Sequence, residues 1–151
     1  MRLDNPNRDI DKAIQYLTES AENGYSIGYR YLGWIYSPIE HDYGKIKNID
    51  LAIDYLKKAA EMKDADASNS LGVLYGDYKN KYYDAAYYTM LAHKYNSYNK
   101  IYNENYQNYR SRLTEQEQMR LKRILLVDNV VWCIKKTNTT KKIKQSFYLL
   151  L

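Results

Sequence analysis

The sequence predicts an all-α fold, an α/α solenoid with two clear helix-pair repeats, one degenerate repeat and a C-terminal capping helix. Residues 10–36 and 49–75 align without a gap at a constant offset of 39, and 11 of the 27 aligned pairs are identical. Apolar residues within each copy recur at steps of three and four, the period of a helix with one buried face. A fixed repeat of this length is typical of solenoids, in which each unit buries its apolar face against its neighbours.

The first copy predicts two helices joined by a glycine turn. The first helix begins at Ile10, and its apolar face consists of Ile10, Ala13, Ile14, Leu17 and Ala21. Asn23-Gly24 ends this helix, because glycine adopts the left-handed conformation without a steric cost. A second helix is expected from about Ser26 to Tyr36, with Ile27, Tyr31 and Ile35 on its apolar face.

The second copy repeats this plan, with Lys63-Asp64 in place of the Asn-Gly turn. Its two apolar faces consist of Ile49, Ala52, Ile53, Leu56 and Ala60, and of Ala67, Leu71, Leu74 and Tyr75. A weaker third unit begins near Tyr82, because Ala85 and Tyr88 match Ala52 and Tyr55 at an offset of 33. Tyrosines then recur at helical spacing and predict a buried stripe, formed by Tyr95, Tyr98, Tyr102, Tyr106 and Tyr109.

Thr114 and Glu117 have the spacing of a capping box, in which each side chain bonds to a backbone N–H of the other residue. This pair predicts the start of the last helix. We expect a loop at 1–8, a repeat domain at 9–126 and a basic, poorly ordered tail at 127–151. The expected units of the repeat domain are 9–47, 48–81 and 82–112, followed by a capping helix at 114–126.

Two short motifs occur in both clear units. One is alanine followed three positions later by tyrosine, and the other is Leu-Gly-x-x-Tyr. They occupy Ala13, Tyr16, Leu32, Gly33 and Tyr36 in the first unit, and Ala52, Tyr55, Leu71, Gly72 and Tyr75 in the second. These motifs resemble the Sel-one-like repeat family, whose unit is an antiparallel helix pair related to tetratricopeptide repeats. The resemblance implies a solenoid that binds other proteins as an adaptor or scaffold.

The small residues of these motifs predict where helices approach one another closely. A glycine inside a helix costs about 1 kcal/mol relative to alanine. Its recurrence at the same position indicates that close packing offsets this cost, since two helices come near only where side chains are small. We therefore expect Ala13, Ala52, Gly33 and Gly72 to be helix contact points.

The residues offer little support for catalysis. The two histidines, His41 and His93, are 52 positions apart, and the single cysteine, Cys133, has no histidine motif beside it. We found no glycine-rich phosphate loop, paired-cysteine metal motif or Gly-x-Ser-x-Gly. The sequence therefore predicts a non-enzymatic protein without a cofactor or metal. A single cysteine and a polar N-terminus predict a cytoplasmic protein without a membrane span.

The net charge of +5 comes from the end of the chain. Of 23 basic residues, five lysines lie in 129–151 without any acid, which leaves 18 basic and 18 acidic residues in 1–128. A lysine-rich tail together with a tyrosine-rich helix is the basis of an alternative function, a nucleic-acid-binding accessory protein. The neutral body disfavours this alternative.

The expected partner is another protein or peptide. In solenoids that resemble this one, the first helix of each pair lines the concave face. The exposed positions there differ between units and are expected to bind the partner: Gln15, Glu19, Asp54, Lys58 and Tyr87. The alternative is that these residues form a solvated helix face. Self-association is expected through the uncapped first unit, because no helix is predicted before Ile10.

Overall fold

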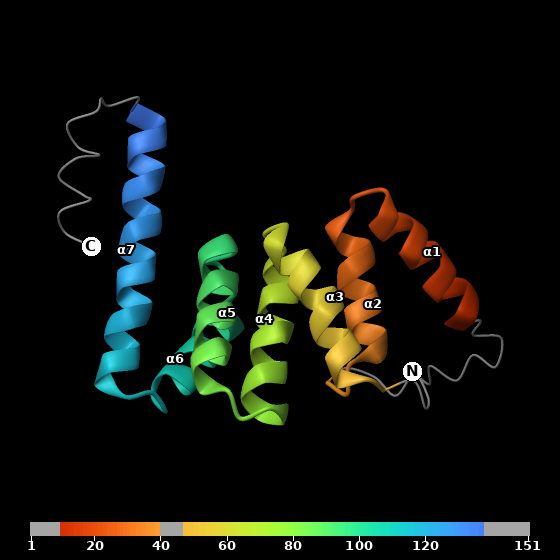
Figure 1. Ribbon diagram of the computed structural model, residues 1–151, viewed down its shortest axis with the longest axis horizontal. Coiled ribbons are helices and arrows are strands. Elements are labelled where there is room, and N and C mark those ends of the chain that lie inside the picture. Colours follow the sequence, from red (N-terminus) through yellow and green to blue (C-terminus); the bar gives the residue numbers. More distant parts are fainter. Residues whose placement is uncertain (1–9, 40–46, 138–151) are drawn as a thin grey trace. The chain divides into compact units, whose positions relative to one another are not determined.

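The computed structural model describes residues 10–39 and 47–137, and this part of the chain is helical and contains no strand. The chain separates into two compact units, Met1–Arg112 and Leu113–Leu151, which we describe separately. The first unit contains the following elements (Figure 1): α1 (Ile10–Glu22), α2 (Ser26–Tyr36), α3 (Ile49–Glu61), α4 (Ala65–Val73), the π-helical turn η1 (Leu74–Tyr78), α5 (Tyr82–Tyr95) and α6 (Lys100–Arg110). The second unit contains α7 (Glu115–Thr137).

Consecutive helices of the first unit pack against each other. Each of α1 to α5 contacts the next helix in the chain, α2 also contacts α4, and α4 contacts α6. Small and aliphatic side chains fill the space between them, and those fully shielded from solvent are Ala52, Leu56, Ala59, Ala67, Leu71, Leu74, Ala85, Ala86 and Ala92. Burial of this apolar surface is the main stabilising contribution to the unit.

Two glycines allow the same kind of close approach at two helix contacts. A Cβ atom on Gly33 of α2 would lie 2.6 Å from Leu56 Cγ of α3, and one on Gly72 of α4 would lie 2.5 Å from Thr89 Cγ2 of α5. Leu56 and Thr89 are equivalent at the offset of 33 that relates Ala52 to Ala85. The predicted contact points Gly33, Gly72 and Ala52 are confirmed.

Ala13 is exposed on α1, so no helix of the described residues packs closely on it and its role as a contact point stays a prediction. The close approach between α1 and α2 instead uses Gly28, which the motifs did not indicate. A Cβ atom on Gly28 would lie 2.7 Å from the backbone oxygen of Leu17. Of the predicted apolar face of α1, only Ala21 is fully buried.

The buried face of α2 also differs from the prediction. Ile27 and Tyr31 were expected in the core, but they are 46% and 40% exposed. The buried residues of this helix are Gly28, Leu32, Gly33 and Ile35. Neighbouring helices therefore approach α2 on the side that carries its glycines, where the backbones come closest.

The predicted tyrosine stripe is interrupted by a turn. Helix α5 ends at Tyr95, and α6 begins at Lys100. Asn99 precedes α6, and its side chain accepts a hydrogen bond from Ile101 N at 3.1 Å. Tyr98 lies in this turn and is 95% exposed, whereas Tyr102 and Tyr109 are buried as expected.

In the second unit, α7 begins with the predicted capping box. Thr114 N donates to Glu117 Oε2 at 2.9 Å, and Glu117 N donates to Thr114 Oγ1 at 3.3 Å. The backbone hydrogen bond from Thr114 lowers the pKa of Glu117. The helix continues to Thr137, so the expected end of the capping helix at residue 126 is wrong. The rest of the predicted tail, 138–151, and the predicted loop at 1–8 lie outside the described residues.

The turns after α1 and α3 have the same geometry. Gly24 has a φ of 82° and Lys63, its equivalent, has a φ of 65°. Each turn contains an equivalent backbone hydrogen bond. Tyr25 N donates to Ser20 O at 3.1 Å after α1, and Asp64 N donates to Ala59 O at 3.2 Å after α3. These bonds satisfy carbonyl groups that the helix end would otherwise leave unpaired.

We expect Lys63→Gly to raise the free energy of unfolding by about 0.5–1 kcal/mol, because a side chain disfavours the left-handed region that Lys63 occupies. Chemical denaturation of the wild type and the variant measures this difference. Met62→Gly is the matched control, since Met62 has a φ of −82° and gains nothing from glycine. A loss of stability in Lys63→Gly would contradict the prediction.

Candidate protein-interaction surface

The predicted partner-binding residues lie on three helices of the first unit. Gln15 and Glu19 are exposed on α1, Asp54 and Lys58 are exposed on α3, and Tyr87 is half-buried on α5. Lys58 and Tyr87 each belong to a group of stacked tyrosines with lysines above the rings. We call these groups the first and second tyrosine–lysine clusters. Among the described residues, no aromatic ring is seen in contact with Gln15, Glu19 or Asp54.

The first tyrosine–lysine cluster consists of Tyr29, Tyr36, Tyr55 and Lys58. The rings of Tyr36 and Tyr55 are stacked, with centroids 5.9 Å apart and an interplanar angle of 16°. Lys58 Nζ lies 5.4 Å from the centre of the Tyr29 ring and 6.0 Å from that of Tyr55. Burial, followed by the neighbouring Tyr36 and Tyr29, raises the pKa of Tyr55. The ammonium group is thus held against two aromatic faces that attract it.

The second tyrosine–lysine cluster consists of Tyr75, Tyr87, Tyr88, Lys57 and Lys81. Tyr75 and Tyr88 are stacked, with centroids 5.6 Å apart and an interplanar angle of 11°. Tyr87 meets Tyr88 edge to face at 5.1 Å. Lys57 Nζ and Lys81 Nζ lie 5.8 Å and 6.0 Å from the Tyr75 ring. A hydrogen bond with Tyr75 raises the pKa of Lys57.

The stacked tyrosine pairs of the two clusters occupy equivalent positions, whereas the lysines do not, since the equivalent of Lys58 is Leu91. Tyr36 and Tyr75 are related by the offset of 39, and Tyr55 and Tyr88 by the offset of 33. In each cluster a tyrosine from the end of one helix pair stacks on a tyrosine from the next pair. Tyrosines held by such contacts lose little conformational freedom on binding, which is one reason why tyrosine is enriched at protein interfaces.

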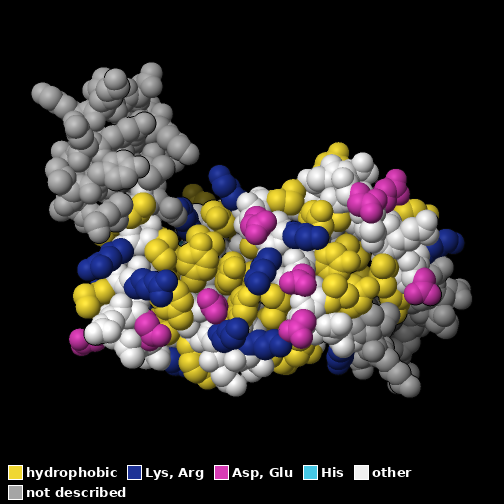
Figure 2. Space-filling view, in the orientation of Figure 1, with side chains coloured by type: hydrophobic (Ala, Val, Ile, Leu, Met, Phe, Trp, Pro, Cys, Tyr) yellow, Lys and Arg dark blue, Asp and Glu magenta, His cyan; other side chains and the backbone are white. Residues whose placement is uncertain are grey.

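Charged side chains of both signs are mixed over the surface. Figure 2 shows Lys and Arg side chains lying among Asp and Glu side chains, with hydrophobic groups between them. A surface that binds a nucleic-acid backbone usually carries a stripe of one sign, whereas a protein interface combines charges of both signs with aromatic groups. The face in view shows no stripe of charge of one sign.

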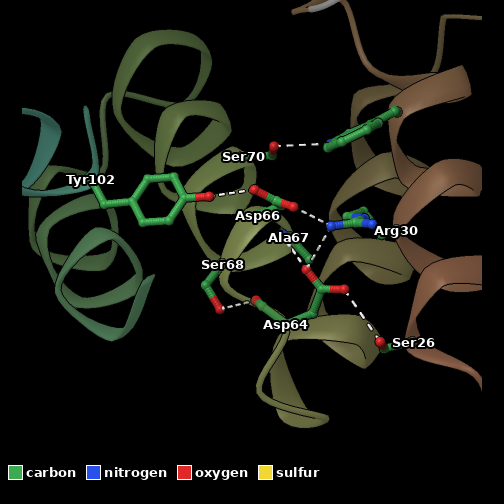
Figure 3. A network of polar contacts seen from close by, with 9 residues as sticks. Ser26, Arg30, Asp64, Asp66, Ala67, Ser68, Ser70 and Tyr102 are labelled. Carbon is green, nitrogen blue, oxygen red and sulfur yellow. Dashed lines mark hydrogen bonds and ion pairs between the residues drawn. The ribbon is translucent and has the colours of Figure 1, made fainter. Parts of the chain in front are cut away.

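A polar network joins α2, α4 and α6 (Figure 3). Arg30 of α2 lies between two carboxylates of α4, with Nη1 3.4 Å from Asp64 Oδ1 and in a closer ion pair with Asp66. Asp64 also accepts hydrogen bonds from Ser26 Oγ at 3.2 Å and from Ala67 N at 3.0 Å. Its side chain therefore caps α4 and holds α2 at the same time.

Tyr102 connects the third helix to this network. Its hydroxyl group donates a hydrogen bond to Asp66 from the side opposite Arg30. The Trp34 ring N–H donates to Ser70 Oγ at 3.0 Å one turn further along α2 and α4. Because Arg30 and both carboxylates have oppositely charged partners, we interpret the network as a fixed structural link between helices.

Raising the pH is expected to destabilise the protein partly through Tyr102. Burial, and then the hydrogen bond to Asp66, raise the pKa of Tyr102 from its ordinary value of 10.0 to about 12. Folding therefore favours the protonated phenol. The resulting stability is fully present below pH 10 and is lost as the pH rises towards about 12.

Denaturation curves measured between pH 9 and pH 12 test this expectation. Tyr102→Phe should be less stable than the wild type at neutral pH, because Asp66 loses a donor, but its stability should fall less steeply over this pH range. An equal slope in both proteins would show that Tyr102 does not contribute.

Only one of the remaining chemistry-bearing side chains, that of His93, lies within the described residues. His93 is half-buried on α5, and no hydrogen-bond partner of its Nδ1 is seen among the described residues. His41 and the Cys133 side chain lie outside the described residues. Within the described ranges, no group of three or more His, Cys, Asp or Glu residues could hold a metal ion. None of the helices described here is long and apolar enough to cross a membrane.

Comparisons with protein-family models, with curated proteins and with solved structures found no match to this chain.

Proposed function

We propose that this protein is a non-catalytic protein-interaction module, an adaptor, scaffold or partner-neutralising protein built as a Sel-one-like solenoid. The observation that carries the proposal is the stacked tyrosine pair at two equivalent positions, each with lysines over its rings, although those lysines come from positions that are not equivalent. Each cluster includes a residue expected to bind the partner, Lys58 in the first and Tyr87 in the second.

The repetition of specific contacts supports the solenoid part of the proposal. The approach of Gly33 to Leu56 has a counterpart in the approach of Gly72 to Thr89. The stacking of Tyr36 on Tyr55 has a counterpart in that of Tyr75 on Tyr88. A solenoid is built from such nearest-neighbour contacts, repeated between one unit and the next.

The clusters also indicate the chemistry of the partner. The half-buried rings of Tyr55, Tyr87 and Tyr88 can contact apolar or aromatic side chains of a partner, whereas Tyr75 is buried, and the lysines of both clusters attract carboxylates. Asp54 lies one helical turn before Lys58 on α3 and adds a negative charge to the same exposed helix. We therefore expect a partner segment that combines apolar side chains with carboxylates and has at least one basic group.

Affinity capture of partners with the wild type and with Lys58→Ala tests the proposal. The expected result is that Lys58→Ala loses a specific partner that the wild type retains, while circular dichroism shows the same helix content in both. Lys100→Ala is the matched control, because Lys100 is also exposed but lies on α6, outside both clusters. Capture of the same set of proteins by all three would contradict the proposed surface.

Nucleic-acid binding is the competing outcome of this experiment. Phosphate contacts release counterions, so an affinity of this kind falls steeply as the salt concentration rises. An affinity for nucleic acid that disappears when residues 129–151 are removed would favour this function over the protein-interaction module.

A further inference from the structure

We infer that α1 is a docking face for a helix of a separate protein, and that this helix carries a glycine followed three residues later by a tyrosine. The inference rests on the proposed stacking of helix pairs, but it concerns a surface away from both tyrosine–lysine clusters. It follows from a comparison of three equivalent helices, α1, α3 and α5.

The equivalent faces of α3 and α5 are both covered within the chain. Ala52 and Leu56 of α3 are fully buried where α2 brings Gly33 against them. Ala85 and Thr89 of α5 are fully buried where α4 brings Gly72 against them. Three residues after each glycine, a tyrosine stacks on the tyrosine of the covered helix.

Helix α1 has equivalent residues on this face, but no described helix packs on them as α2 packs on α3 and α4 packs on α5. Ala13 is exposed where Ala52 is fully buried, and Leu17 is only half-buried where Leu56 is fully buried. Tyr16, the equivalent of Tyr55, is 63% exposed. The face has thus kept an alanine that permits close approach of a helix and a tyrosine that could stack on the ring of an incoming tyrosine.

Each glycine that is followed three residues later by a tyrosine already packs against a helix of the same chain. We call these residues glycine–tyrosine pairs. The whole sequence contains glycine followed three residues later by tyrosine at Gly28, Gly33 and Gly72. Gly28 packs on α1 itself at the Leu17 carbonyl, Gly33 on α3 and Gly72 on α5. A second copy of the chain would have to unfold one of these contacts in order to offer such a pair, so a folded second copy is not the expected occupant.

The probe is a peptide with the sequence of residues 26–36, the helix that covers α3. An isolated helix of this length is marginal in water, so a hydrocarbon staple is required. The staple can replace Ile27 and Tyr31, which are spaced four residues apart and are exposed in α2. This design keeps Gly33 and Tyr36 and removes Tyr31, so only one glycine–tyrosine pair remains in the peptide.

Fluorescence anisotropy of the labelled peptide with the full chain measures the binding. We expect saturable binding to the wild type and at least a tenfold weaker affinity for Ala13→Leu, which fills the space that the glycine would enter. A peptide carrying Gly33→Leu should lose affinity for the wild type to a similar extent. The matched control is Glu22→Leu, which adds the same side chain at an exposed position of α1 on the side opposite Ala13 and should leave the affinity unchanged.

Two results would overturn the inference. One is the absence of binding, or binding that Ala13→Leu does not weaken, since the peptide would then use another surface such as α3. The other is a dimer of the wild type in sedimentation that Ala13→Leu abolishes, because the occupant would then be a second copy. The proposed function is tested separately by Lys58→Ala, so the failure of either proposal leaves the other open to its own test.

Discussion

Gly72→Leu is expected to destabilise the Met1–Arg112 unit by about 3 kcal/mol or more, a large part of the roughly 5–15 kcal/mol by which folded domains are typically stable, and so to lower its melting temperature strongly. Even a Cβ atom at this position would lie 2.5 Å from Thr89 Cγ2 and 3.0 Å from the backbone oxygen of Ala85. The methyl group of Thr89 could move, but the Ala85 backbone belongs to α5 and cannot shift alone. The leucine would therefore force α4 and α5 apart and expose the alanines packed between them.

Thermal and chemical denaturation, followed by circular dichroism, measure this loss. Gln15→Leu is a control for the added side chain, because it lies at an exposed position of α1 and should change stability by less than about 0.5 kcal/mol. An unchanged melting temperature in Gly72→Leu would contradict the close packing of these two helices.

A milder pair of substitutions locates the cause of the destabilisation. Gly72→Ala should be destabilising, and Thr89→Ser should recover part of the loss when combined with it. Serine removes Cγ2 but retains the hydroxyl group that donates to Ala85 O at 2.8 Å. Sites in direct contact are expected to show such non-additive effects, so a strictly additive double variant would argue against this contact.

The sequence predicts much of this fold because its helix ends carry clear local signals. Asn23-Gly24 correctly places the end of α1, and Thr114 with Glu117 correctly places the start of α7. Such signals act through the backbone within a few residues and depend little on the tertiary structure. The same holds for the repeated glycines, whose cost within a helix already indicates a close contact.

Periodicity predicts less well which side of a helix is buried. In α2, Ile27 and Tyr31 have the same helical spacing as the buried residues, but the neighbouring helices approach the side that carries Gly28 and Gly33. The helical spacing of the tyrosines continues across the turn between α5 and α6, so the spacing alone gave no reason to exclude Tyr98 from the predicted buried stripe. The asparagines on either side of that turn, Asn96 and Asn99, were the available signal, because asparagine favours helix ends.

The candidate surface was only partly predictable for a similar reason. Lys58 and Tyr87 were predicted to bind the partner because they differ between equivalent positions, whereas Tyr36 and Tyr55 were interpreted as scaffold because they do not. Their stacking depends on how closely α2 approaches α3, which is a property of the packed structure. Lys57 and Lys81 were missed, since a lysine gains an aromatic partner only when another helix brings the ring to it.

Arg30→Met is expected to reduce the free energy of unfolding by about 2 kcal/mol. Methionine keeps an apolar stem near Trp34, whereas it leaves both carboxylates without the guanidinium group. The side chains of Arg30 and Asp64 are 15% and 9% exposed, so this pair is shielded from solvent. The Asp66 side chain is 47% exposed, and screening by water keeps the expected loss below that of a fully buried ion pair.

Lys79→Met is the matched comparison, since it breaks an ion pair of the same kind at an exposed place. Lys79 Nζ lies 2.7 Å from Asp50 Oδ1, but the two side chains are 33% and 83% exposed. An exposed pair contributes less than about 1 kcal/mol, so this variant should remain close to the wild type in stability. If the two variants lose equal stability, burial does not distinguish the pairs, and the network around Arg30 is not the link that holds α2 to α4. If only Arg30→Met is destabilised and added salt reduces the difference little, the shielded network fixes how these two helices pack.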